Sequence, residues 1–124
     1  MNKSKSFTEL IVWQKAHKLV LNIYKLTKSF PKEELYSLTS QMRRSAISIP
    51  ANIAEGYKKK TPKDKLRFFN VAEGFLEELK YYLILARDLK YCKIDDLIDP
   101  TNEVGKLISG YTNSIKKNNE NSIS

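Results

Sequence analysis

The sequence contains few of the residues that catalytic and metal sites use. Among 124 residues there is one cysteine, Cys92, and one histidine, His17. A single cysteine excludes an internal disulfide and fits a reducing compartment. The motifs CxxC, HExxH, GxxxxGK and GxGxxG are all missing from the sequence, which removes the common signals for zinc, protease, P-loop and dinucleotide sites. We therefore expect no enzymatic activity, no cofactor and no metal.

Long apolar runs are missing as well. No stretch approaches the roughly 20 apolar residues needed to cross a bilayer. No apolar segment follows the polar residues 1–6, as it would in a signal peptide. We expect a cytoplasmic protein with no membrane partner. Its length fits a single domain over residues 1–124 that can bury a modest core.

Acidic residues are the scarcer charged class. The chain carries 22 Lys and Arg against 14 Asp and Glu, a formal net charge of +8 at pH 7. Such an excess favours anionic partners, either nucleic acid or an anionic membrane surface. A lysine-rich surface that is merely solvated has the same composition, so charge alone leaves both interpretations open.

Capping and stop signals divide the chain into four amphipathic helices. The start signals are the capping box at residues 6–9, Thr61-Pro62 and Asp99-Pro100, and the first stop signal is Phe30-Pro31. The predicted helices span residues 7–29, 38–57, 62–90 and 99–116, and the polar tail over residues 117–124 is predicted to be frayed. Short connections between four such helices predict an all-α fold, an antiparallel up-down four-helix bundle.

The first two helices show apolar stripes at helical spacing. The first stripe joins Leu10, Trp13, His17, Val20, Tyr24 and Thr27, and the second joins Leu38, Met42, Ala46, Ile49 and Ile53. His17 is therefore predicted to be a packed or interface histidine. Pro50 removes a backbone hydrogen bond from the second helix at a cost of about 3 kcal/mol. Because the stripe continues in phase across Pro50, we predict a kink over residues 46–50 and not a break.

The second helix is unusual on its other sides. Beside its apolar stripe, spacings of 4, 3, 4 and 3 form a polar line of Gln41, Ser45, Ser48, Asn52 and Glu55. The remaining side carries Ile47, Ala51 and Ala54, where an exposed helix would carry Lys and Glu. We expect the helix to be enclosed, either as a central bundle helix or as a subunit interface whose polar line fixes register. Arg44 is expected to pair with Glu55 or with Glu78 of the third helix, since a buried charge needs a partner.

Positive charge gathers where the second helix meets the third. We define this basic corner as Lys58, Lys59, Lys60, Lys63, Lys65 and Arg67. Only Asp64 opposes it, and Tyr57 and Phe68 flank it. Such a patch, with Arg43 added, could contact phosphates with an affinity that falls as salt rises. A solvated loop beside a helix cap would have the same sequence, and no helix-turn-helix or RNA-module signature predicts sequence-specific binding.

The most specific pattern is LTSQMRRSAISIPANIAEG at residues 38–56, preceded by Phe30-Pro31 and Glu34. With Leu10 and Trp13-Gln14-Lys15-Ala16 in the first helix, and Ala72-Glu73-Gly74 and Glu78-Leu79 in the third, it closely resembles the signature of the four-helix bundle proteins encoded in 23S rRNA intervening sequences. The matching signature positions are Gln41, Arg44, Ser48, Asn52, Glu55 and Gly56. The likeness covers nearly the whole chain. Phe75 departs from it, because many members carry a small Ser there.

The resemblance implies a bacterial, cytoplasmic protein that forms a ring-like homo-oligomer, usually a pentamer. It also suggests association with rRNA, and the similar accessory proteins of diversity-generating retroelements hold nucleic acid on a basic bundle surface. Two functions follow. The first is a non-enzymatic oligomeric scaffold that binds rRNA or other nucleic acid without strong sequence preference. The alternative is a protein-interaction subunit of an RNA-processing or retroelement complex, in which the basic corner only aids solubility.

Overall fold

The computed structural model describes residues 5–123, with the side chains of residues 5–119. This part of the chain is helical. It forms the α-helices α1 (Ile11–Thr27), α2 (Leu38–Lys58), α3 (Pro62–Asp88) and α4 (Asp95–Ile123), with short 3-10 helices η1 (Phe7–Glu9) before α1 and η2 (Lys32–Glu34) before α2. Residues 5–123 contain no strand. The prediction of an all-helical fold with four main helices is therefore confirmed.

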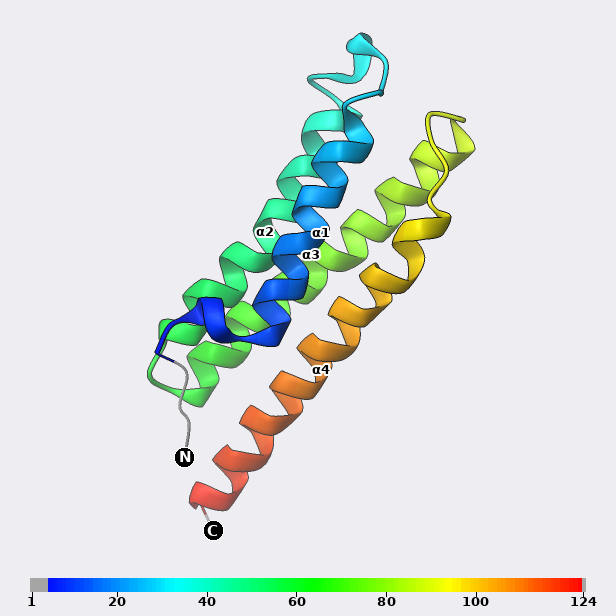
Figure 1. Ribbon diagram of the computed structural model, residues 1–124. Helices are drawn as coiled ribbons and strands as arrows, with labels where there is room; N and C mark the ends of the chain where they lie inside the picture. The colour runs from blue at the N-terminus through cyan, green and yellow to red at the C-terminus, as the bar shows by residue number, and fades with distance from the viewer. Residues whose placement is uncertain (1–4, 124) are drawn as a thin grey trace.

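The four helices lie side by side along much of their length (Figure 1). The α1–α2 and α3–α4 connections lie at one end of the molecule, and the tight α2–α3 turn lies at the other. α2 contacts α1 and α3, and α4 contacts the same two helices, whereas α2 and α4 do not contact each other. The α2–α3 pair makes the most extensive contact. None of the helices in the described residues is long and apolar enough to cross a membrane.

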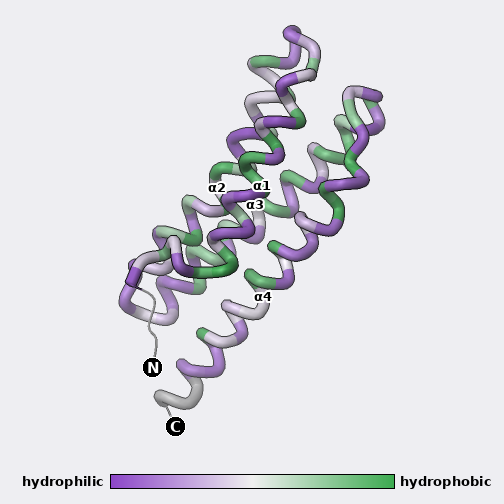
Figure 2. The backbone as a smooth tube through the Cα atoms, in the orientation of Figure 1, coloured by the Kyte–Doolittle hydropathy of each residue, from purple (hydrophilic) through white to green (hydrophobic). Residues whose placement is uncertain are grey.

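The predicted apolar stripe of α2 forms the centre of the core. All five of its residues are buried, and Met42, Ile49 and Ile53 are completely so. They pack in one cluster with Phe69, Leu76 and other buried residues of the neighbouring helices. Pro50 is buried within α2, which continues through it from Leu38 to Lys58. In Figure 2 hydrophobic and hydrophilic residues alternate along all four helices, as expected where one side of each helix faces the core.

The buried face of α1 differs from the predicted stripe. Its buried residues are Val12, Ala16, Leu19, Val20, Ile23 and Thr27. His17 is exposed, so it is not packed within this chain, and the alternative of an interface histidine stays a prediction. Its ring stacks on half-buried Trp13, with centroids 5.0 Å apart and an interplanar angle of 7°. The large aromatic side chains thus cover the edge of the bundle, and the small Ala16 lets α1 approach the core.

The start of α1 also differs from the prediction. The Ser6 hydroxyl accepts a hydrogen bond of 3.2 Å from the Thr8 N–H, so the capping box begins the short helix η1. Leu10 then takes an extended conformation, with ψ of 129°, which separates η1 from α1. The helix expected from residue 7 to 29 therefore runs from Ile11 to Thr27. At the end of α3, Lys90 takes a left-handed φ of 65°, and that helix ends at Asp88 and not at residue 90.

α4 is longer at both ends than the predicted span of 99–116. It begins at Asp95, because Asp95 and Asp96 occupy its first turn and their charges complement the helix dipole. Pro100 therefore lies inside the helix and not at its first position. The backbone is helical to Ile123, beyond the predicted end at residue 116, and residue 124 of the predicted frayed tail lies outside the described residues. No glycine or proline follows Gly110 to stop the helix.

Candidate nucleic-acid interface

The basic corner is built around the tight turn between α2 and α3. Lys59 leaves α2 in an extended conformation, and its N–H donates a hydrogen bond of 3.2 Å to the Gly56 carbonyl. The Thr61 hydroxyl accepts one of 3.2 Å from the Asp64 N–H, and Pro62 is the first residue of α3. These cap interactions match the start predicted at Thr61-Pro62. The turn therefore brings the charges at the end of α2 next to those at the start of α3.

Gly56 is a signature position that this turn requires. A β-carbon built there would lie 3.0 Å from Cβ of Phe68 and 3.1 Å from Cε2 of Phe69. Phe69 is completely buried, so its ring has little freedom to move away. Glycine thus allows α2 and α3 to approach closely just before the chain reverses.

Lys65 has a structural role in the basic corner. Its Nζ donates a hydrogen bond of 2.7 Å to the Tyr57 carbonyl and lies 3.5 Å from the Gly56 carbonyl, both at the end of α2. A cation at this position satisfies terminal carbonyls and complements the helix dipole. Partial burial lowers the pKa of the Lys65 ammonium group below its usual value. Lys65 therefore already has a partner inside the protein, and its predicted phosphate contact stays a prediction.

Phe68 is half-buried and lies between two cationic side chains of the basic corner. Nζ of Lys59 is 5.0 Å from the ring centroid and Cζ of Arg67 is 5.3 Å from it, which are cation–π distances. Arg67 also lies 3.8 Å from the Asp64 carboxylate. The aromatic ring thus holds two cations in place at the surface beside the turn.

The other three lysines of the basic corner are unrestrained. Lys58, Lys60 and Lys63 are exposed. Their side chains make no hydrogen bond, ion pair or cation–π contact to another residue within the described part of the chain. Three mobile ammonium groups next to the two cations on Phe68 form a surface that can contact several phosphates at once.

Arg43 is not part of the basic corner. It lies on the same helix as Lys58, about 22 Å away along the axis at a rise of 1.5 Å per residue. Its Nε donates a hydrogen bond of 2.9 Å to the Thr27 hydroxyl, and its guanidinium group lies 4.6 Å from the Tyr24 ring centroid. Its guanidinium thus joins α2 to α1 away from the basic corner, and the phosphate contact expected of Arg43 stays a prediction.

The predicted polar line of α2 is divided in the structure. Ser45 is buried and donates a hydrogen bond of 2.6 Å to Oε1 of Glu78 on α3. The Ser48 hydroxyl and the Asn52 amide instead donate to carbonyls of their own helix, at 2.8 and 2.7 Å. Gln41 and Glu55 at the two ends are exposed. Only Ser45 therefore acts as a seam between helices within one chain.

The predicted pairing of Arg44 with Glu55 or Glu78 is wrong. Arg44 is exposed, and it has no ion pair with either carboxylate in the described residues. Glu78 instead accepts the hydrogen bonds of Ser45 and of the Tyr82 hydroxyl, the latter at 3.1 Å. Burial, followed by the hydrogen bond to Glu78, raises the pKa of Tyr82. Tyr82 was not predicted as a site residue, although its spacing of four residues from Glu78 on one helix places the two on one face.

The remaining side of α2 is not enclosed by this chain. Ile47 is 43% exposed, Ala51 is exposed and Ala54 is half-buried. The interpretation of α2 as a central helix surrounded within its own bundle is therefore wrong. An apolar side facing outward remains compatible with the other interpretation, a subunit interface.

Groups suited to catalysis are not brought together. Cys92 is half-buried, and burial raises the pKa of its thiol, which disfavours the reactive thiolate. His17 lies on α1 with its ring against Trp13. Within the described residues, no three His, Cys, Asp or Glu side chains are placed to hold a metal ion. The arrangement is suited to binding through charge and stacking.

Known proteins resemble this chain in sequence and in fold. The family model of the 23S rRNA-intervening sequence protein matches residues 8–110. The crystal structure of a protein of unknown function from the S23 ribosomal protein family of Bacteroides thetaiotaomicron superposes with a TM-score of 0.76. That match covers 83% of this chain and 96% of the other at 24% sequence identity, so it shows a shared fold. No curated protein sequence matches the chain.

Proposed function

Because the chain belongs to the 23S rRNA-intervening sequence protein family, we propose that it is a non-enzymatic, homo-oligomeric bundle that binds rRNA or other nucleic acid. Each subunit is an antiparallel up-down bundle with α2 kinked at Pro50. The observation that carries the proposal is the basic corner, where Lys58, Lys60 and Lys63 are free beside the cation-flanked ring of Phe68. The protein acts in the cytoplasm, where its targets are made.

Binding through the basic corner depends on phosphate and not on base identity. Lysine ammonium groups contact phosphates as point charges, and phosphate contacts carry no information on base sequence. One such patch binds weakly at physiological salt. A ring-like oligomer, a pentamer as expected for the family, repeats the patch on every subunit and increases the overall affinity through avidity.

The test is a titration of a fluorescently labelled, structured rRNA fragment with the protein. Binding is measured by fluorescence anisotropy at several salt concentrations. Replacing Lys58, Lys60 and Lys63 together by Ala should lower the affinity at least tenfold and reduce the slope of log K against log salt by about 2, close to 0.7–0.9 per lost phosphate contact. The matched control replaces by Ala three exposed lysines of α1 and its C-terminal cap, Lys18, Lys25 and Lys28. Equal losses of affinity in the two triple variants would mean that RNA is attracted only by the net charge of the protein and not by the basic corner. If the wild type did not bind RNA at low salt, the proposal would be refuted.

A second function, a protein-interaction subunit of an RNA-processing or retroelement complex, is favoured by a different observation. Tyr36 is 92% exposed and Leu35 is 45% exposed, and both lie at the opposite end of the bundle from the basic corner. Exposed apolar side chains that lie together often mark a protein-binding surface. A protein partner retained after nuclease treatment of the lysate, and lost in Tyr36→Ser, would support this function over nucleic-acid binding.

A further inference from the structure

One surface of the molecule combines exposed apolar side chains with two arginines. We call it the arginine groove and define it by Tyr24, Leu35, Tyr36, Arg43, Arg44 and Ile47. It lies between α1 and the first half of α2 and has a volume of about 500 Å³. No carboxylate lines it. Ile47, Leu35 and Tyr36 are 43%, 45% and 92% exposed, so water covers apolar side chains that usually seek a partner.

Polar groups of the arginine groove also lack partners. Arg44 forms no ion pair in the described residues, although its neighbour Arg43 is held by Thr27 and Tyr24. The Thr39 hydroxyl, which borders the groove, is buried and makes no hydrogen bond within the part of the chain that is described. A carboxylate from outside the chain would satisfy Arg44 with a charge-assisted hydrogen bond.

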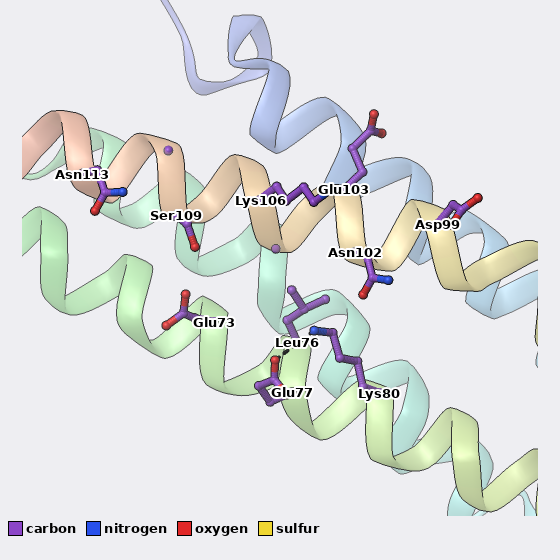
Figure 3. Close-up of a pocket in the computed structure, with 12 residues that line it drawn as sticks. Glu73, Leu76, Glu77, Lys80, Asp99, Asn102, Glu103, Lys106, Ser109 and Asn113 are labelled. Carbon is purple, nitrogen blue, oxygen red and sulfur yellow. Dashed lines mark hydrogen bonds and ion pairs between the residues drawn. The ribbon is translucent and has the colours of Figure 1, made fainter.

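A second groove carries the opposite charge. It lies between α3 and α4, has a volume of about 970 Å³, and is defined here as the acidic groove by Glu73, Glu77, Lys80, Asp99, Glu103 and Lys106. Figure 3 shows its α3 wall, with Glu73, facing its α4 wall, with Ser109. Four carboxylates against two lysines make it a local acidic surface on a chain of net charge +8.

Two carboxylates of the acidic groove are available to a partner. Glu77 pairs with Lys80 at 2.9 Å, and Glu103 pairs with Lys15 of α1 at 3.4 Å. Glu73 and Asp99 have no ion pair among the described residues, and both are exposed. They lie on different helices, so the groove presents one unpaired acid on each wall.

Glycines on the α4 wall leave room for a close approach. A β-carbon at Gly110 would meet no atom within 4 Å, so packing within this chain does not require glycine there. Glycine inside a helix is destabilising relative to alanine. Gly110 and Gly105 both line the groove, where they expose the α4 backbone to whatever binds.

We propose that the arginine groove of one copy docks on the acidic groove of a second copy of this chain. The inference rests on the proposed homo-oligomer and names its two contacting surfaces. Charge selects the pairing, because copies that each carry +8 repel one another unless opposite local charges meet. Arg44 lies against the unpaired carboxylate of Glu73, and Ile47 and Tyr36 cover the glycine wall. Asp99 lies further along the groove, beyond Asn102 (Figure 3), and adds to its negative charge.

This contact is head-to-tail, since the two grooves lie on different helix pairs of the same chain. A contact between two different surfaces leaves one of each free on the resulting dimer, so growth continues until a ring closes. The basic corner contributes no residue to either groove. Assembly therefore leaves Lys58, Lys60 and Lys63 open on every subunit.

The test uses sedimentation velocity of full-length protein over a range of concentrations. One variant, Arg44→Glu, reverses the charge of the arginine groove, and a second, Glu73→Lys with Asp99→Lys, reverses that of the acidic groove. All three substituted residues are exposed, so circular dichroism should show that the helix content of both variants is unchanged. Lys58→Glu is the matched control, because it makes the same charge change at an exposed site of the same helix outside both grooves.

Each groove variant alone should sediment as a single chain, with its association constant at least tenfold weaker than that of the wild type, and the control should assemble normally. Mixing the two groove variants should restore association, since the mixture contains one intact groove of each kind. Three results would overturn the proposed docking but not the homo-oligomer. These are assembly of Arg44→Glu as in the wild type, loss of assembly in Lys58→Glu, and a mixture of the two groove variants that stays dissociated. A wild type that is a single chain at every concentration would overturn both.

Discussion

The Ser45 hydroxyl on α2 donates a hydrogen bond of 2.6 Å to Oε1 of Glu78 on α3, across the most extensive helix pair of the molecule. Tyr82 donates to the same oxygen from one turn further along α3, at 3.1 Å. The two hydroxyl groups satisfy one oxygen of a carboxylate that is partly buried between helices. Because Ser45 is completely buried and Glu78 is not, the serine fixes the position of the acid at the edge of the core.

The first prediction concerns this hydrogen bond. Ser45→Ala should lower the free energy of unfolding by about 1–3 kcal/mol, because it removes one partner of a partly buried carboxylate. Chemical denaturation measures the change. Ser48→Ala is the matched control, since that hydroxyl only donates to the Arg44 carbonyl of its own helix, and it should change the stability by less than about 0.5 kcal/mol. Equal effects of the two changes would contradict a special role for Ser45.

The second prediction separates two glycines. Gly56→Ala should destabilise the fold by about 1–3 kcal/mol, because its β-carbon would lie 3.0 Å from Cβ of Phe68 with the buried Phe69 behind it. Gly74→Ala should stabilise the fold by up to about 1 kcal/mol, because a β-carbon there meets nothing within 4 Å and alanine favours helix. Thermal unfolding of the two variants should therefore shift the midpoint in opposite directions. A stable Gly56→Ala protein would mean that the turn can widen freely.

The buried face of α2 was predictable from the sequence, whereas that of α1 was not. On α2 the buried positions are also the most apolar ones at helical spacing, so periodicity alone identified Met42 and Ile49. On α1 the sequence offers two apolar sides, and the aromatic residues Trp13 and Tyr24 favoured the wrong one. Only packing against α2 and α4 decides between them, and it selects the side with small Ala16.

The candidate sites show the same limit. The basic corner was predictable because its residues are close in sequence. The roles of Lys65 and Arg43 were not, since each is set by a partner that the fold brings near, a Tyr57 carbonyl and the Thr27 hydroxyl. The acidic groove was missed because its carboxylates come from two helices that only the fold brings together, although the acids of each helix are four residues apart and so share one face.

The third prediction concerns pH. The Tyr91 hydroxyl donates a hydrogen bond of 2.7 Å to the Glu34 carboxylate, which raises the pKa of Tyr91 above the ordinary 10.0, with burial as the second cause. The folded state holds this proton more tightly than the unfolded state. The stability that the bond contributes is therefore complete below about pH 10 and is lost as the pH rises through the higher pKa of the folded protein.

Ultraviolet titration of the phenols, with unfolding measured in parallel, tests this assignment. Tyr91→Phe should remove one late-titrating phenol and flatten the loss of stability above pH 10. Tyr81→Phe, which removes an exposed tyrosine without a hydrogen bond to Glu34, should leave the late step in place. An unchanged alkaline titration in Tyr91→Phe would show that the hydrogen bond to Glu34 does not hold the proton.

The fourth prediction separates the structural lysine of the basic corner from those proposed to bind phosphate. Lys65→Ala should lower the free energy of unfolding by about 1 kcal/mol, because the Tyr57 carbonyl at the end of α2 loses its charged donor. Lys63→Ala, two positions earlier on α3, is the control and should leave stability nearly unchanged, since its side chain is exposed and makes no contact in the described residues.

Nucleic-acid binding should respond in the opposite order. Lys63→Ala should weaken the affinity for structured RNA two- to fivefold and lower its salt dependence, because each lost phosphate contact removes one counterion-release term. Lys65→Ala should change the affinity less, since its ammonium group already points at the protein backbone. Denaturation and RNA titration on the same two variants provide the measurement. If Lys65→Ala lost more RNA affinity than Lys63→Ala while remaining equally stable, Lys65 would be a phosphate ligand, and its contact with α2 would be dispensable.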